Sequence, residues 1–250
     1  EIWTDLVKAE LREISATEGR VLIARVTGGL GNQVFSYALI SFFRAKFGYD
    51  VYIDVSLIKA QGLHRSFELS GLFSGLKLVD LSGALETKDG KYFVLGGFHY
   101  SRHPNPLNWS SVVAEDKIVI ENIRSNSLFF SHLNLDTIEQ RFGLLTARLS
   151  SKAFFDDTDW LSNTLVIHVR RGDYPFYLPA SYYNEAYKRL TKSHNRFRRI
   201  LVCTDDSIWV RNTFKFEPDL YLDSKLGLSV NESFLLLIFG QTRILSEGTY

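Results

Sequence analysis

The segment Thr164-Leu165-Val166-Ile167-His168-Val169-Arg170-Arg171-Gly172-Asp173-Tyr174 decides the fold of this chain. Its first half is apolar and β-branched, which predicts a buried strand over residues 165–169. The strand end then carries polar and charged residues, namely His168, Arg170, Arg171, Gly172 and Asp173. Ligands of open α/β sheets bind beyond the carboxyl ends of the strands, and guanidinium groups match phosphate oxygens. The segment therefore predicts either an anion-binding strand end or a surface turn of arginine and aspartate.

A second strand-to-helix turn lies upstream, between a predicted strand at residues 21–26 and a predicted helix at residues 30–47. It contains Gly28, Gly29 and Gly31, which let a ligand approach the amide groups at a helix N-terminus. We expect Gly29 and Gly31 to leave little room for a Cβ atom, and Asn32 either to contact a ligand or to cap the helix. The spacing Gly-Gly-x-Gly-Asn-Gln matches neither the dinucleotide fingerprint nor the P-loop.

Predicted strands and helices alternate along most of the chain, which is typical of parallel βαβ units. The predicted strands cover residues 21–26, 51–54, 92–95, 117–121, 165–169, 199–203, 220–222 and 243–245. The predicted helices cover residues 30–47, 135–148, 181–192, 207–214 and 229–239. Residues 62–107 are richer in Gly, Ser and Pro, so we expect mostly irregular structure there.

Together, the two turns resemble the α-1,2-fucosyltransferase family of glycosyltransferases. The family's signatures Gly-Gly-Leu-Gly-Asn-Gln and His-x-Arg-Arg-Gly-Asp-Tyr stand here at residues 28–33 and 168–174. Ser181-Tyr182-Tyr183 and the strand and acidic turn at residues 200–206, followed by Trp209, also resemble the family. The likeness spans residues 21–250. The connection between Tyr174 and Ser181 is shorter than the family's, and the family's chain continues past the segment that ends here at Tyr250.

The resemblance implies an α/β fold of the GT-B-like class, with two Rossmann-like halves facing across a cleft. An acceptor-side domain is expected at residues 1–155, and a nucleotide-sugar-binding domain, truncated at its C-terminal end, at residues 156–250. The implied activity is inverting transfer of L-fucose from GDP-β-L-fucose to the 2-hydroxyl of a galactose-containing oligosaccharide or glycan. The alternatives are a transferase for another nucleotide sugar, a protein O-fucosyltransferase-like activity, and a degenerate nucleotide-sugar-binding domain.

In such a reaction, negative charge grows on the leaving diphosphate, and fixed cations stabilise it. Arg170 and Arg171 are the predicted catalytic cations, and Asp173 is either a general base or an orienting partner for an arginine. The predicted donor-binding residues are Gly28, Gly29, Gly31, Asn32, His168, Asp205, Asp206 and Glu232, joined by Ser246 and Thr249 from the resemblance. Some of these residues have a structural role as the alternative to donor binding. His168 could be a hydrogen-bonded structural residue at the strand end, Asp205 and Asp206 could cap the following helix, and Glu232 could be an acidic residue that stabilises the first turn of its helix.

The composition excludes some classes of partner. Lys and Arg number 29 against 28 Asp and Glu, so a bulk charge that attracts nucleic acid is absent. Cys203 is the only cysteine, which excludes an intrachain disulfide and a cysteine-rich metal site. No Asp-x-Asp stands at a predicted strand end, so we expect a metal-independent mechanism with no cofactor besides the donor GDP-fucose. The chain has no signal-peptide core and no apolar run of about 18 residues. We expect a cytoplasmic protein, peripheral to the membrane at most, with a Golgi-lumenal catalytic fragment as the alternative.

Overall fold

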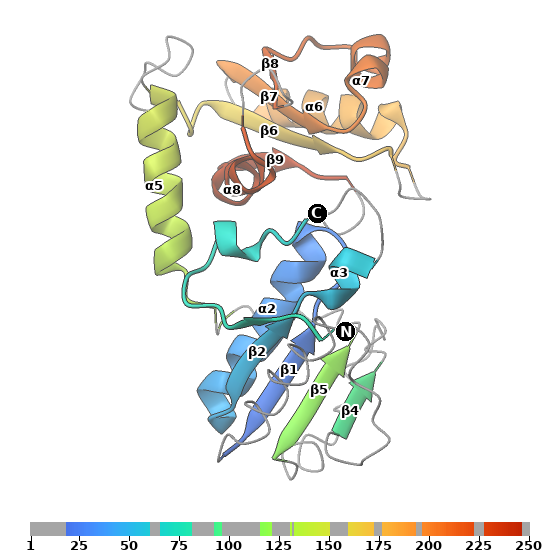
Figure 1. Cartoon of the computed structure of the whole chain (residues 1–250). Helices are drawn as coiled ribbons and strands as arrows, with labels where there is room; N and C mark the ends of the chain where they lie inside the picture. The colour runs from blue at the N-terminus through green and yellow to red at the C-terminus, as the bar shows by residue number, and fades with distance from the viewer. Residues whose placement is uncertain are drawn as a thin grey trace. The chain divides into compact units, whose positions relative to one another are not determined.

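The chain forms two compact units, Glu1–Leu135 and Asp136–Thr249. The computed structural model describes residues 19–60, 66–81, 93–96, 116–121, 131, 133–150, 160–172, 177–193, 197–222 and 228–246. Within these residues, each unit contains one sheet, and every strand pairing in both sheets is parallel (Figure 1). The α/β class with two parallel sheets, expected from the alternation of strands and helices, is confirmed.

The sheet of the first unit has five strands in the order β3-β2-β1-β5-β4. Its elements are β1 (Val21–Arg25), α2 (Leu30–Phe47), β2 (Asp50–Asp54), α3 (Ser56–Ala60), the 3-10 helix η1 (Leu69–Gly71), β3 (Leu78–Val79), β4 (Phe93–Gly96) and β5 (Lys117–Glu121). Strand β1 lies at the centre, and its apolar side chains are fully buried. One face of the sheet forms a buried cluster in which Val21, Ile23 and Val119 contact Val79 and Leu81. Because β1 and β2 pair in register to their last residues, Arg25 lies beside Asp54 at the carboxyl edge.

The sheet of the second unit has four strands in the order β8-β7-β6-β9. Its elements are α5 (Asp136–Ser150), β6 (Thr164–Val169), α6 (Ala180–Ser193), β7 (Arg199–Thr204), α7 (Ser207–Thr213), β8 (Leu220–Tyr221), α8 (Val230–Phe239) and β9 (Thr242–Ile244). Every residue of β6 is buried. Leu165, Ile167 and Val169 face a core shared with helices α6 and α7, whereas Val166 faces the C-terminal end of α8. Strand β6 is therefore covered on both faces.

Helix α5 belongs to the second unit, so the division of the chain lies at residue 135 rather than at the expected residue 155. The helix is tied to α8 by the Phe142 and Phe239 rings, which stack with centroids 4.3 Å apart. Arg148 of α5 also forms an ion pair with Glu232 of α8. These contacts join segments far apart in the chain, which a local reading of the sequence does not reveal.

Two further features of the fold bear on the sequence analysis. Residues 62–107, expected to be mostly irregular, include η1 and β3 as well as the expected strand at β4. None of the described helices combines the length and the hydrophobicity that crossing a bilayer requires.

Candidate functional site

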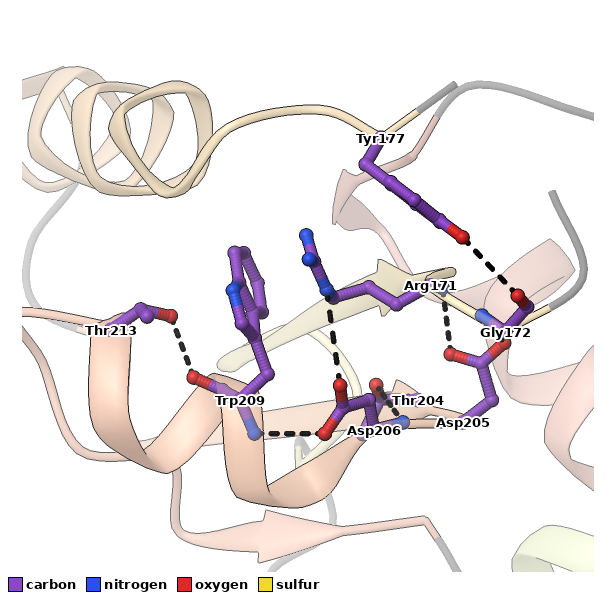
Figure 2. Close-up of polar contacts among 8 residues, drawn as sticks. All are labelled: Arg171, Gly172, Tyr177, Thr204, Asp205, Asp206, Trp209 and Thr213. Atoms are coloured by element: carbon purple, nitrogen blue, oxygen red, sulfur yellow. Dashed lines mark hydrogen bonds and ion pairs between the residues drawn. The ribbon is translucent and has the colours of Figure 1, made fainter. Parts of the chain in front are cut away.

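The carboxyl end of β6 continues into a turn at residues 170–172, which we call the arginine turn. Asp205, at the end of the neighbouring strand β7, holds this turn with both of its carboxylate oxygens. Its Oδ1 accepts a hydrogen bond from the amide of Arg171 at 2.7 Å, and its Oδ2 accepts one from the amide of Gly172 at 2.7 Å (Figure 2). A Cβ atom at Gly172 would lie 2.8 Å from Asp205 Oδ2, closer than real Cβ contacts. Glycine at this position therefore lets the carboxylate reach both amides.

The guanidinium of Arg171 lies between aromatic rings. Its Cζ atom is 4.0 Å from the ring centroid of Trp209 and 4.8 Å from that of Tyr177, well within the range of cation–π attraction. Its Nε atom is 3.9 Å from Asp206 Oδ2, a weak ion pair. Tyr177 is in turn tethered to the arginine turn, because its hydroxyl donates to the Gly172 carbonyl at 3.3 Å. The side chain of Arg171 is thus held by groups from the N-terminal end of α7 and from the segment before α6.

Asp206 has a second role as the N-cap of helix α7. Its Oδ1 accepts a hydrogen bond from the Trp209 amide at 2.9 Å, and its own amide donates to Thr204 Oγ1 at 3.0 Å. The capping role considered for Asp206 is therefore present in the structure. For Asp205 the partners are the amides of the arginine turn instead of those of helix α7.

His168 and Ser246 meet at the same edge of the sheet. Ser246 Oγ and His168 Nδ1 lie 2.7 Å apart, and the Ser246 amide donates to the His168 carbonyl at 3.0 Å. Burial is the main cause that lowers the pKa of His168 to about 4; the positive charge of Arg170 acts in the same direction, and the Asp205 carboxylate partly opposes both. His168 is consequently a neutral imidazole at physiological pH. The Tyr182 hydroxyl donates to the Leu245 carbonyl at 3.0 Å, which fixes the segment that carries Ser246.

In the first unit, the glycine turn (residues 28–31) follows β1 and leads into α2. Gly28 has φ +75°, a conformation that favours glycine, and a Cβ atom there would collide with the Asn32 side-chain amide. At Gly29, by contrast, a Cβ atom would meet nothing within 4 Å, so the expectation of little room at Gly29 is wrong. The N-cap of α2 is Gly29, with no side-chain capping bond, so Asn32 is not the cap. Gly31 is buried in the first turn of the helix.

Gln33, which the sequence analysis did not single out, fixes the glycine turn from inside. It is fully buried, and its Nε2 donates to the carbonyls of Gly28 at 3.1 Å and Ser66 at 3.0 Å. Its Oε1 accepts from the Glu68 amide at 2.9 Å. The buried amide therefore ties residues 66–68 to the glycine turn.

A buried carboxylate supports the adjacent edge of the first sheet. Asp54 is fully buried and accepts hydrogen bonds from Arg25 Nε at 2.9 Å, from the amide and hydroxyl of Ser56 at 2.9 Å each, and from the Leu81 amide at 3.1 Å. A buried charge is tolerated only when it is paired and hydrogen-bonded, as it is here. Arg25 and Asp54 therefore have a structural role.

The predicted residues fall into separate groups. His168, Arg170, Arg171, Asp205, Asp206 and Ser246 gather at the carboxyl edge of the second sheet, and Gly28, Gly29, Gly31 and Asn32 lie at that of the first. Glu232 forms a capping box with Ser229 at the start of α8 and pairs with Arg148, which accounts for its position without a ligand. Asp173 and Thr249 lie outside the described residues. Trp209 and Tyr177 were not predicted as site residues, because an isolated aromatic residue carries no chemical signature.

Comparisons with known proteins indicate the class to which the fold belongs. No family model matches the chain. The O-antigen biosynthesis glycosyltransferase WbnK of Escherichia coli is 31% identical over 100 residues, which cover 36% of this chain and 32% of WbnK. The matched region thus spans about a third of that relative's length.

Among solved structures, the chain is similar to the α-1,6-fucosyltransferase NodZ of Bradyrhizobium. The NodZ structure soaked with GDP-fucose aligns with a TM-score of 0.50 at 16% identity, over 91% of this chain and 88% of NodZ. The structure of POFUT1 in complex with GDP-fucose aligns with a TM-score of 0.40 at 8% identity, over 92% of this chain and 91% of POFUT1. The chain therefore has an α/β fold with two parallel sheets like that of NodZ.

Proposed function

We propose that this chain is an inverting glycosyltransferase that moves L-fucose from GDP-β-L-fucose to the 2-hydroxyl of a galactose-type acceptor. The observation that carries the proposal is the arginine turn, where two adjacent arginines stand at the carboxyl end of a buried parallel strand and Asp205 binds the amides of Arg171 and Gly172. The motif resemblance at residues 28–33 and 168–174, and the likeness of the fold to NodZ, support the same class of reaction.

In the proposed reaction, the acceptor hydroxyl attacks the anomeric carbon of fucose from the side opposite the diphosphate. The bond between that carbon and the β-phosphate oxygen breaks, GDP leaves, and the hydroxyl proton passes to a base. Arg170 and Arg171 stabilise the charge that develops on the diphosphate. Asp173 accepts the proton or orients an arginine. Neutral His168 keeps its partner Ser246 in place beside the arginine turn.

The glycine turn is proposed to serve the donor sugar. The side-chain amide of Asn32 lies against Gly28, and Gln33 holds this turn from within. Asn32 is proposed to donate to a hydroxyl of the sugar or to a phosphate oxygen. Because Asn32 is not the helix cap, Asn32→Ala is expected to lower turnover markedly while it changes the free energy of unfolding only a little.

Isothermal titration with GDP, UDP and ADP tests the donor class. Selective binding of GDP is the expected result. A preference for UDP favours a transferase of another nucleotide sugar, and the absence of any nucleotide binding favours a degenerate domain. A transfer assay with GDP-fucose and galactose-terminated oligosaccharides, followed by linkage analysis of the product, then distinguishes the α-1,2 product from others.

The proposed mechanism needs no divalent metal, because the arginines carry the leaving-group charge. Transfer should therefore continue at an unchanged rate when EDTA is added to the assay. A strict requirement for Mg²⁺ or Mn²⁺ would contradict the proposed role of the arginines.

A further inference from the structure

Neighbouring groups hold the side chain of Arg171 in one orientation, although attraction to an anion does not by itself require a fixed orientation. A free arginine side chain samples many rotamers, and a ligand that binds it must first immobilise it. Here Trp209, Tyr177 and Asp206 already surround the guanidinium, and its side chain is only 23% exposed. Among the described residues, these three make the ring contacts and the ion pair of the guanidinium, and its charge also acts on Tyr183.

The contacts from Trp209, Tyr177 and Asp206 lie away from the terminal nitrogens of the guanidinium. The ring contacts involve the central carbon, and Asp206 lies on the Nε side. Figure 2 shows the two terminal nitrogens directed away from Asp206. Those terminal nitrogens form the edge that binds two oxygens of an anion in parallel. The arrangement therefore presents a binding edge without blocking it.

Trp209 is the main element of this arrangement. Its centroid makes the closer of the two ring contacts with Arg171, and its backbone amide is fixed by the same Asp206 that pairs with Arg171. The indole is also packed against the core of the second unit, next to Tyr183 and Phe214. A ring fixed on its far side by the core is a rigid platform for the guanidinium.

We infer that Trp209 is a positioning residue for ligand binding, which acts by holding the Arg171 guanidinium with its terminal nitrogens directed to an anionic ligand. The inference rests on the proposed function, since the anion is taken to be the diphosphate of the donor. In this proposal Trp209 acts only through Arg171 and does not itself bind the phosphate. Its effect should therefore disappear when Arg171 is absent.

A double-mutant cycle on GDP affinity tests the inference. Trp209→Leu should weaken GDP binding by about 10-fold, the loss expected when the ligand must immobilise a long side chain. Trp209→Phe keeps a ring and should restore most of the affinity. In an Arg171→Ala background, Trp209→Leu should change GDP affinity by less than about 2-fold, because partners in one interaction are not additive. Guanosine, which lacks phosphate, should bind Trp209→Leu and the unchanged protein equally.

Phe214→Leu is the matched control for lost packing. Phe214 belongs to the same aromatic cluster and is likewise partly buried, yet it does not contact Arg171. This variant should lower the melting temperature as Trp209→Leu does, while keeping GDP affinity within about 2-fold of the unchanged protein. An equal loss of GDP affinity in both variants would overturn the positioning role.

Two other outcomes also decide the question. If folded Trp209→Leu binds GDP as tightly as the unchanged protein, or loses affinity equally with and without Arg171, the inference is wrong. If the unchanged protein binds no GDP, the proposed function fails, and the same cycle is measured with inorganic pyrophosphate. Coupling between Trp209 and Arg171 for pyrophosphate supports the positioning role by itself, and its absence overturns both proposals.

Discussion

The glycine turn and the arginine turn occupy equivalent places in their sheets but are held by different forces. Both follow a buried parallel strand at the carboxyl edge. The glycine turn is fixed by an uncharged group, the buried Gln33 amide, and by the backbone conformation of Gly28, which has a positive φ. The arginine turn is fixed by carboxylates and rings near the surface. Loss of the buried Gln33 amide should therefore appear mainly in stability, and loss of either arginine mainly in ligand binding and turnover.

The largest expected effect comes from the arginines. Arg170→Ala or Arg171→Ala should lower kcat/KM by about 100- to 1000-fold, as removal of a charged transition-state contact does. Lysine should restore activity only in part, because it lacks the planar fork. Steady-state kinetics and thermal melts of the same variants provide the check. Near-normal turnover in both alanine variants would show that the arginine turn does not bind the donor.

The second effect is a response to pH at His168, near the end of β6 and close to the arginine turn. The pKa of His168 is about 4 in the folded chain, whereas the ordinary histidine value is 6.5. Between these values the unfolded chain binds a proton that the folded chain does not, so stability should fall as the pH is lowered across this range. The loss should reach about 3 kcal/mol. Urea unfolding at several pH values measures it, and His168→Asn should flatten the profile over that interval.

The glycine turn should respond through Gln33. Gln33→Leu leaves two carbonyls and one amide without their partner, so the free energy of unfolding should fall by about 2 kcal/mol. Gln140 is an exposed glutamine of helix α5, and Gln140→Leu is the matched control, with an expected change below about 0.5 kcal/mol. Chemical denaturation compares the two. Equal stability of both variants would mean that Gln33 does not hold the turn.

The smallest effect separates the two roles of Asp206. Asp206→Ala removes the cap of α7 and should cost about 1 kcal/mol of stability, whereas Asp206→Asn keeps a good capping residue and should cost less than about 0.5 kcal/mol. Thermal melts distinguish them. A loss as large in the asparagine variant as in the alanine variant would indicate that the charge opposite Arg171 matters more to stability than the cap does.

Local sequence patterns predicted most of the regular elements, because long apolar or amphipathic runs determine them. Helix α2 begins and ends where its pattern indicated, and β6 differs by one residue. Strand β3 is two residues long, Leu78–Val79, which is too short to show a periodicity. The place of α5 could not be predicted, because its contacts with α8 join residues such as Phe142 and Phe239 across almost a hundred positions of the chain.

The sequence predicted which residues lie at the candidate site better than it predicted the contacts that they make. The charged residues after β6 and β7 identified the edge of the second sheet. The sequence did not indicate that Asp205 binds the backbone of Arg171 and Gly172, because a carboxylate has many possible partners. Trp209 was noted only as part of a resemblance. At the glycine turn, the sequence shows three glycines but does not indicate that Gly28 is the one whose conformation and surroundings require glycine.

The two hydrogen bonds between the arginine turn and the Asp205 carboxylate have a consequence for hydrogen exchange. Gly172 is exposed, and an exposed amide in a turn ordinarily exchanges its hydrogen with solvent quickly. Because the Arg171 and Gly172 amides both donate to one carboxylate, their exchange requires that the Asp205 side chain move away from the turn. The exchange of these two amides thus reports in a single measurement whether Asp205 holds the arginine turn, with or without a ligand bound.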